Sequence, residues 1–181
     1  LYLQNPSSNT DMYNTAVGYN AGAAVTTGIQ NTLIGGLVGD SITSGGGNTI
    51  MGYAAGDALT TGNSNVAVGL SALSGDTLGD RAVAIGQGAL NAQNFTSSTD
   101  NYNVGVGYNA GAAVTTGVQN TFIGGLAGDA VTTGDSNTAV GHLSLSANTT
   151  GTANVAVGTN ALDANTTASN NTAVGYASLG A

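Results

Sequence analysis

The chain of 181 residues has no cysteine, no tryptophan, no glutamate and no lysine, and it has one proline, one arginine and one histidine. The lack of cysteine excludes disulfide bridges and leaves the redox compartment open. The formal net charge is −8 and there is no basic patch, so nucleic acid and anionic lipid are disfavoured as partners. No stretch approaches the roughly 18 apolar residues of a membrane-spanning helix, which excludes membrane insertion by such a helix. No signal-peptide pattern begins the chain, and a first residue Leu1 instead of Met indicates a processed or excised segment.

Catalytic chemistry needs ionisable side chains that converge, and this chain offers few. A Ser-His-Asp site would have to use His142, which occupies a repeat column that also holds four tyrosines, so a substitution within the repeat explains it better. No pair of glutamate and aspartate carboxylates stands out for polysaccharide hydrolysis. We therefore expect no enzymatic activity. The tyrosines of this column are Tyr19, Tyr53, Tyr108 and Tyr176.

The dominant feature that is present is a five-residue motif, NTAVG or a close variant, which recurs ten times. The sequence number rises by 17 from each motif glycine to the next, except for one longer step of 21 from Gly86 to Gly107. This period fits neither a helical heptad nor a paired-helix repeat, and the segments are rich in Val, Ile, Thr and Ala. The sequence predicts an all-β protein, a parallel β-solenoid (β-roll) of about ten 17-residue coils. The motif glycines, which we expect in tight turns, are Gly18, Gly35, Gly52, Gly69, Gly86, Gly107, Gly124, Gly141, Gly158 and Gly175.

Each coil is predicted to contain one strand over N-T-A-V-G-Y, a second strand over A-V-T-T, and a return through a glycine. The residue directly before each motif glycine is always apolar, which predicts that this column faces a dry interior. The residue two before the glycine is never charged either, so both faces of the first strand are mostly apolar. Such a strand needs a second layer or another subunit, and we predict a homo-oligomer, a trimer. The column before the glycine is Val17, Ile34, Met51, Val68, Ile85, Val106, Ile123, Val140, Val157 and Val174.

Two polar columns accompany these apolar ones. An asparagine stands four residues before nine of the ten motif glycines, and stacked coils would bring these amides about 4.8 Å apart, within reach of mutual hydrogen bonds. We expect a structural asparagine ladder, interrupted only at Ala82. Its members are Asn14, Asn31, Asn48, Asn65, Asn103, Asn120, Asn137, Asn154 and Asn171. The second column, expected to face water, is Thr26, Thr43, Thr60, Thr77, Thr115, Thr132, Thr149 and Thr166.

A second level of repetition defines the domain organisation. The segment Gly18 to Gly28 recurs unchanged as Gly107 to Gly117, which indicates that a block of five coils was duplicated. We predict one continuous solenoid with a lead-in over 1–13, a first block over 14–90, an inserted loop over 91–102 and a second block over 103–181. The loop is expected to protrude and to offer contact residues, namely Asn94, Phe95, Asp100 and Tyr102.

Calcium is the one cofactor that the sequence leaves open. The segments GGLVGDSIT and GGLAGDAVT look like calcium-binding nonapeptide repeats, but the glycine adjoins the aspartate instead of standing two residues before it. Turn aspartates that bond their own backbone are the better interpretation, so no cofactor is predicted. Unchanged thermal stability in excess chelator would dismiss calcium. The aspartates concerned are Asp40, Asp57, Asp129 and Asp163.

The segments NTAVGYNAG, NVAVGLSAL, AVAIGQGAL and NVAVGTNAL resemble two related groups of repeats. They are similar to the YadA-like head repeats of trimeric autotransporter adhesins, whose coils carry N-x-V-A-I-G motifs in a left-handed parallel β-roll. They also resemble the NTAVG-type repeats of tail-fibre proteins from phages and marine bacteria. The resemblance covers the chain from Asn14 onward. It implies a trimeric fibre, extracellular or on a virion, that holds or displays a receptor-binding surface, with a cell-surface glycan as the expected ligand.

Three functions follow as hypotheses. A segment of a phage tail fibre comes first, and a bacterial surface adhesin or extracellular filament subunit is the alternative. Ice binding is an alternative of another class, because flat solenoid faces with ranks of threonine serve that task. Only one regular outward rank of threonine is evident from the sequence, and thermal hysteresis would discriminate between these hypotheses.

Overall fold

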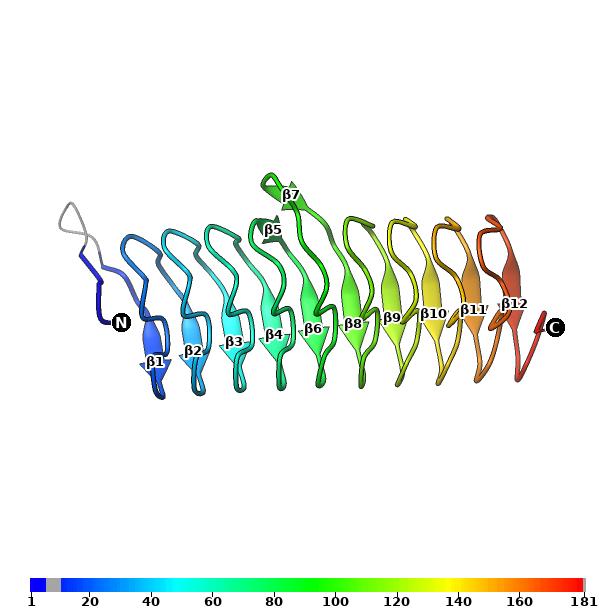
Figure 1. The fold of residues 1–181 in the computed structure, drawn as a ribbon, viewed down its shortest axis with the longest axis horizontal. Helices are drawn as coiled ribbons and strands as arrows, with labels where there is room; N and C mark the ends of the chain where they lie inside the picture. The colour runs from blue at the N-terminus through cyan, green and yellow to red at the C-terminus, as the bar shows by residue number, and fades with distance from the viewer. Residues whose placement is uncertain (6–10, 181) are drawn as a thin grey trace.

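The computed structural model describes residues 1–5 and 11–180, and these residues form a parallel β-solenoid without any helix (Figure 1). One strand from each coil joins a single ten-stranded sheet, and two further short strands form a small sheet of their own. The predicted solenoid fold is confirmed. The ten strands are β1 (Thr15–Val17), β2 (Thr32–Ile34), β3 (Thr49–Met51), β4 (Val66–Val68), β6 (Val83–Ile85), β8 (Val104–Val106), β9 (Thr121–Ile123), β10 (Thr138–Val140), β11 (Val155–Val157) and β12 (Thr172–Val174), and the small sheet pairs β5 (Gly79–Asp80) with β7 (Thr99–Asp100).

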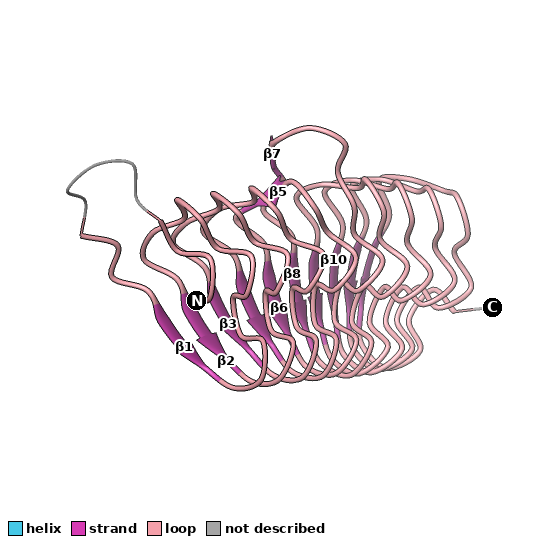
Figure 2. Ribbon diagram, turned by 60° about the vertical axis from the view of Figure 1, so that its left-hand side comes forward, coloured by secondary structure: helices cyan, strands magenta, loops and turns pink. Residues whose placement is uncertain are grey.

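Equivalent residues of neighbouring coils lie side by side along the whole sheet (Figure 2). Thr15 pairs with Thr32 and Val17 pairs with Ile34, and the other regular steps repeat this register. The one longer step, from β6 to β8, keeps the same register, since Val83 pairs with Val104. Like side chains therefore form continuous columns from β1 to β12.

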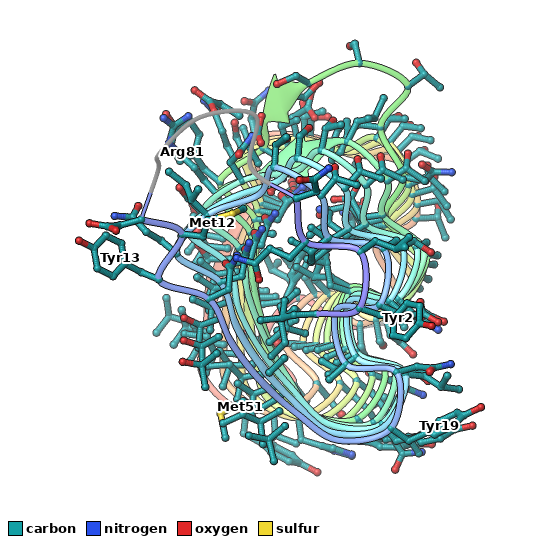
Figure 3. The ribbon with its side chains drawn as sticks, turned by 90° about the vertical axis from the view of Figure 1, so that its left-hand side faces the viewer. Tyr2, Met12, Tyr13, Tyr19, Met51 and Arg81 are labelled. Carbon is teal, nitrogen blue, oxygen red and sulfur yellow. The ribbon has the colours of Figure 1, made fainter. Side chains whose placement is uncertain are left out.

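The column that faces the interior is the one two residues before the motif glycine. Leu33, Ile50 and Phe122 from this column are fully buried, whereas Val17 is 57% exposed and Met51 is 39% exposed. Met51 lies outside the ribbon, on the outer side of the sheet (Figure 3). The prediction that the column directly before the glycine faces the interior is therefore wrong for this chain. Successive strand residues point to opposite sides, so only one of the two apolar columns can enter the core.

Side-chain volume explains which column is inside. The interior also receives larger side chains from the rest of each coil, among them Val25, Ile42 and Leu59. In six of the ten coils the residue two before the motif glycine is alanine, which takes up little of the remaining interior space. In those six coils the larger Val or Ile of the other column is left on the outside, whereas Leu33, Ile50 and Phe122 are large side chains that do enter the interior.

The second predicted strand, over A-V-T-T, is wrong as well. This part of the coil consists of turns and bends, although neighbouring coils still bond there, as from Thr26 N to Thr43 O at 2.9 Å. Just before this segment, Asn20 and Gly22 have φ values of 54° and 58°. Left-handed residues turn the backbone away from the extended form that a strand requires.

The inserted residues leave the coil only briefly. Asn94 N bonds Thr115 O at 2.9 Å and Asn101 N bonds Asp80 O at 3.1 Å, so both sides of the insertion remain stacked on neighbouring coils. Phe95 is still buried against the neighbouring coil, and the exposed excursion is residues 96–98, shorter than the predicted loop over 91–102. They lead into β7, which protrudes above the neighbouring coils (Figure 1).

Candidate functional surface: the outward face of the sheet

The outer side of the ten-stranded sheet carries no charged residue. It consists of the residues one and three before each motif glycine, and we call it the sheet face. Its strands show the burial expected of an open surface, with the middle residue inside and the two outer residues half-buried or exposed. An uncharged face of this length is a candidate interface. The sheet face comprises Thr15, Val17, Thr32, Ile34, Thr49, Met51, Val66, Val68, Val83, Ile85, Val104, Val106, Thr121, Ile123, Thr138, Val140, Val155, Val157, Thr172 and Val174.

The threonine column that begins at Thr26 serves the stacking of coils. The Thr26 hydroxyl donates to Thr43 O at 3.2 Å, and the Thr60 hydroxyl donates to Thr77 O at 3.0 Å. These side chains are half-buried. Their hydroxyl protons are already used within the solenoid, so this column is a poor candidate for a ligand-binding surface.

The asparagine column forms a continuous set of hydrogen bonds in the interior. Asn48 Nδ2 donates to Asn31 Oδ1 at 3.0 Å and to the turn carbonyl of Gly62 at 2.9 Å. Its own Oδ1 accepts the backbone N–H of Asn65 at 2.9 Å. Each amide thus ties its own turn to the preceding and following coils. A buried amide bonded in this way is structural and leaves no group for a ligand.

The interruption at Ala82 is repaired by a residue that the sequence analysis missed. Asn101, from the insertion, accepts the backbone N–H of Asn103 at 2.9 Å, the bond that an asparagine at position 82 would accept. Its Nδ2 donates to Asp80 O at 2.7 Å. The available signal was that an extra asparagine stands two residues before Asn103 in the one insertion, directly after the coil that lacks its ladder residue.

A buried polar pair, Asp76 and Gln93, occupies a column that Val25, Ile42 and Leu59 fill in the preceding coils. Gln93 Nε2 donates to Asp76 Oδ2 at 2.6 Å. Neither Asp76 nor Gln93 was predicted from the sequence. Two polar residues in successive coils, directly after three apolar residues of the same column, were the signal that could have found it, because a polar group in the core needs a partner.

Burial raises the pKa of the Asp76 carboxyl above its usual 3.8, and hydrogen bonds from Gln93, Gly79 and Phe95 oppose this rise. The folded state therefore binds this proton more tightly than the unfolded state does. The contribution of Asp76 to the free energy of unfolding is fully present below pH 3.8 and is lost as pH rises through the higher folded pKa. Burial also raises the pKa of Asp57 and of Asp129, so these two carboxyls likewise make the free energy of unfolding fall as pH rises.

The substitution Asp76→Asn tests this pH dependence. The new amide keeps an oxygen for the Gly79 N–H but sets an NH₂ group against Gln93 Nε2, so we expect the variant to be less stable than the wild type at pH 4. This difference should shrink between pH 4 and pH 7, because only the wild type loses the stability linked to protonation. Urea unfolding across this range measures it, with Asp135→Asn as the control for removal of one negative charge. A difference that grows with pH would contradict the assignment.

The predicted contact residues of the insertion do not all face solvent. Phe95 is only 5% exposed, so its prediction as a contact residue is wrong, because a buried ring is not available to a ligand. Asp100 and Tyr102 are exposed and lie with Arg81, which forms a salt bridge with Asp100 and stands 5.9 Å from the centre of the Tyr102 ring. Asn94 is exposed too, and its Oδ1 accepts the Thr77 hydroxyl at 2.9 Å. The loop thus presents a polar cluster beside the solenoid.

The tyrosine column lies along the turn that follows the strands, where Tyr19 projects outward (Figure 3). Tyr19 is 76% exposed, and His142 is exposed in the same column. In residues 1–5 and 11–180, no group of three or more His, Cys, Asp or Glu side chains is placed to hold a metal ion. Asp57 and Asp129 each have one buried carboxylate oxygen without a partner among these residues.

Comparison of the chain with protein-family models, with curated proteins and with solved structures finds no match. Within the described part of the chain, no helix is long and apolar enough to cross a membrane.

Proposed function

We propose that this chain is a structural and adhesive segment of a homotrimeric fibre, of the phage tail-fibre type, that works outside the cell and holds or displays a receptor-binding surface. The observation that carries the proposal is the uncharged sheet face, which extends over all ten coils. The sheet face consists of Val, Ile, Met and Thr side chains. It has none of the charged side chains, such as lysine and glutamate, that keep an open sheet from pairing with other chains. A surface of this kind gains free energy when a partner removes it from water.

Sister chains are the partner that fits this face best. Every coil offers Thr or Val three residues before the motif glycine and Val, Ile or Met directly before it, so parallel copies in register would set uncharged residues against each other along their full length. Closed symmetry would hide all the sheet faces at once and leave no copy with an open one. Resemblance of the motifs to trimeric adhesin heads favours three copies. The exposed Arg81, Asp100 and Tyr102 cluster is the contact proposed for a cell-surface glycan.

Charges placed on the sheet face test the trimer. The double substitution Val68→Glu and Val140→Glu is expected to lower the mass in sedimentation equilibrium from that of three chains to that of one, while the circular dichroism spectrum is retained. Carboxylates cannot enter an apolar interface without a large desolvation cost. The control places the same charges on exposed turns, as Thr61→Glu and Thr133→Glu, and should stay trimeric. A wild-type chain that is monomeric at all concentrations would refute the proposal.

A bacterial surface adhesin or extracellular filament subunit is the alternative within the same class. It would use the same trimer and the same exposed cluster, so solution properties of this chain would not separate the two. Imaging of the intact particle or cell that carries the protein would separate them.

Ice binding is the second candidate function, and one observation favours it. The sheet face has two parallel columns of side chains. The column three residues before the motif glycine contains threonine in six coils, in addition to the separate threonine column that begins at Thr26. This use requires an uncovered sheet face, whereas the trimer requires a covered one. Thermal hysteresis in a monomeric wild-type chain would support ice binding, and a trimer without hysteresis would exclude it. The six threonines are Thr15, Thr32, Thr49, Thr121, Thr138 and Thr172.

A further inference from the structure

The tyrosine column, which directly follows the motif glycines, carries exposed rings along one edge of the solenoid. In coils that have a neighbour on both sides, Tyr53 is 58% exposed, Tyr108 is 54% exposed, and His142 is exposed as well. Tyr19 of the same column projects outward from the turn (Figure 3). Exposed tyrosines are typical of binding surfaces, because the ring is apolar and the hydroxyl is polar.

The backbone holds these rings in line. Tyr53 stands between its motif glycine and Ala54, which has a φ of 51°, so the turn on both sides of the ring has a defined conformation. The carbonyl oxygen of Tyr53 accepts the Ser71 N–H at 3.0 Å, and that of Tyr108 accepts the Leu126 N–H at 2.8 Å. Each ring position is therefore bonded to the next coil. A surface fixed in this way loses little conformational entropy when a ligand binds.

Glycines of the same column leave space beside two of the rings. A Cβ at Gly36, one coil before Tyr53, would lie 3.5 Å from Tyr53 Cδ2 and 3.8 Å from Tyr53 Cε2. These two atoms form one edge of the ring, so an edge points along the solenoid axis and the ring faces are turned away from the neighbouring coil. Gly125 and His142 repeat the arrangement, with 3.6 Å from a Cβ at Gly125 to His142 Cδ2.

The distance between the rings follows from the stacking of the coils. Neighbouring coils are bonded in register, so Tyr108 and His142, two coils apart, are separated by about 9.6 Å along the axis. Tyr53 lies three coils before Tyr108. An extended β-1,4-linked polysaccharide advances by nearly one coil spacing per sugar. A chain of this kind along the axis would place one sugar over each coil, and each ring would meet a sugar.

The charge of the chain selects a neutral ligand. Single-stranded nucleic acid also stacks on rows of aromatic rings, but it needs a positively charged groove as well. Arg81 is the only arginine or lysine, and the formal net charge is −8, so phosphate or sulfate polymers are disfavoured. Between Tyr53 and Tyr108 the column holds Leu70, which is 45% exposed, and the exposed Gln87. An apolar side chain and an uncharged amide suit the C–H groups and hydroxyls of a neutral sugar.

We propose that the tyrosine column is a binding site for a neutral β-linked polysaccharide that lies along the solenoid axis, with its sugar rings stacked on Tyr53, Tyr108 and His142. The site is separate from the sheet face and from the cluster of Arg81, Asp100 and Tyr102. Every contact comes from one chain, so the site does not depend on the proposed trimer. Because several rings hold the same ligand chain, a longer oligomer binds more tightly than a short one.

Isothermal titration calorimetry with oligomers of glucose tests the site. A β-1,4-linked hexasaccharide is long enough to reach from Tyr53 to His142, whereas the disaccharide can stack on one ring only. We expect the hexasaccharide to bind about tenfold more tightly than the disaccharide. An α-1,4-linked hexasaccharide is the matched control, because it has the same composition but a curved chain that cannot follow a straight row of rings. It should bind about tenfold more weakly than the β-linked hexasaccharide.

Substitutions in the column locate the binding. Tyr53→Ala and Tyr108→Ala should each lower the association constant for the β-linked hexasaccharide about fivefold, because each removes one stacking surface. Tyr53→Phe and Tyr108→Phe keep the ring and should stay close to the wild type. His142→Tyr enlarges the ring and should raise the association constant about threefold. These side chains are exposed, so the variants should keep the circular dichroism spectrum of the wild type.

The inference is overturned if the wild type binds both hexasaccharides equally or binds neither, or if the Phe variants lose as much affinity as the Ala variants. Binding that only Arg81→Gln weakens would place the glycan at the loop cluster instead. Tyr53→Ala or Tyr108→Ala variants of lower mass in sedimentation equilibrium would assign the rings to a contact between chains. A trimer without the tyrosine-dependent binding would leave the proposed fibre in place, whereas a monomeric wild type that shows it would remove the trimer and keep this site.

Discussion

Replacement of Phe122 by alanine is expected to lower the free energy of unfolding by about 3–5 kcal/mol, whereas Ile123→Ala should cost about 1 kcal/mol or less. Phe122 is fully buried and its partner on β8 is Gly105, which leaves room for the ring. A Cβ at Gly111 would lie only 2.7 Å from Phe122 Cδ2, so the ring fills the space above this glycine too. Ile123, the next residue, is 40% exposed on the sheet face.

Urea unfolding followed by circular dichroism measures both substitutions. They should be made in the variant that carries Val68→Glu and Val140→Glu, because a trimer would also bury Ile123 and would add its own contribution. Substitution of Thr60, a half-buried residue of the other polar column, serves as a mild reference. If Ile123→Ala lowers the free energy of unfolding as much as Phe122→Ala does, or more, the assignment of Phe122 to the interior and Ile123 to the sheet face is contradicted.

The period and the residue columns made the fold predictable. Ten motifs that recur at a fixed spacing, with no polar residue in the column before the glycine, indicate stacked coils in register. An insertion at one place that leaves the phase intact indicates a loop that stays outside the stack. Both features depend on local repetition, which a single sequence displays in full.

Which of the two strand faces points into the interior could not be predicted in this way. Both columns of the strand are uncharged, so hydrophobicity does not distinguish the inner from the outer one. The deciding quantity is the volume left by side chains such as Val25 and Leu59 from the far side of the coil, and this depends on how the coil closes. The strand expected over A-V-T-T failed for a similar reason, since left-handed residues such as Asn20 and Leu37 cannot be recognised from residue type alone.

Compensating residues were the hardest features to predict. Asn101 repairs the gap at Ala82, and Gln93 satisfies Asp76, through contacts between separate coils. Such pairs appear only after the coils have been aligned in space.

Alanine at Gly124 is expected to destabilise the solenoid by about 3 kcal/mol or more, whereas alanine at the adjacent Gly125 should be nearly neutral. Gly124 directly follows β9 and has a φ of 134°, a region that residues with a side chain rarely adopt. A Cβ there would lie 2.6 Å from the carbonyl oxygen of Gly141 in the next coil. That oxygen belongs to the backbone of a stacked coil and cannot move away without parting the two coils.

Gly125 is the matched control because it differs from Gly124 in both respects. The nearest atom to a Cβ at Gly125 is His142 Cδ2 at 3.6 Å, an ordinary contact with an exposed side chain, and no left-handed φ is required there. Thermal and urea unfolding of the two single variants should separate them by several kcal/mol, since the strain and the overlap act together only at Gly124. All ten motif glycines share this position in the coil. If Gly124→Ala leaves the free energy of unfolding unchanged, close stacking of the coils does not require a glycine at this position.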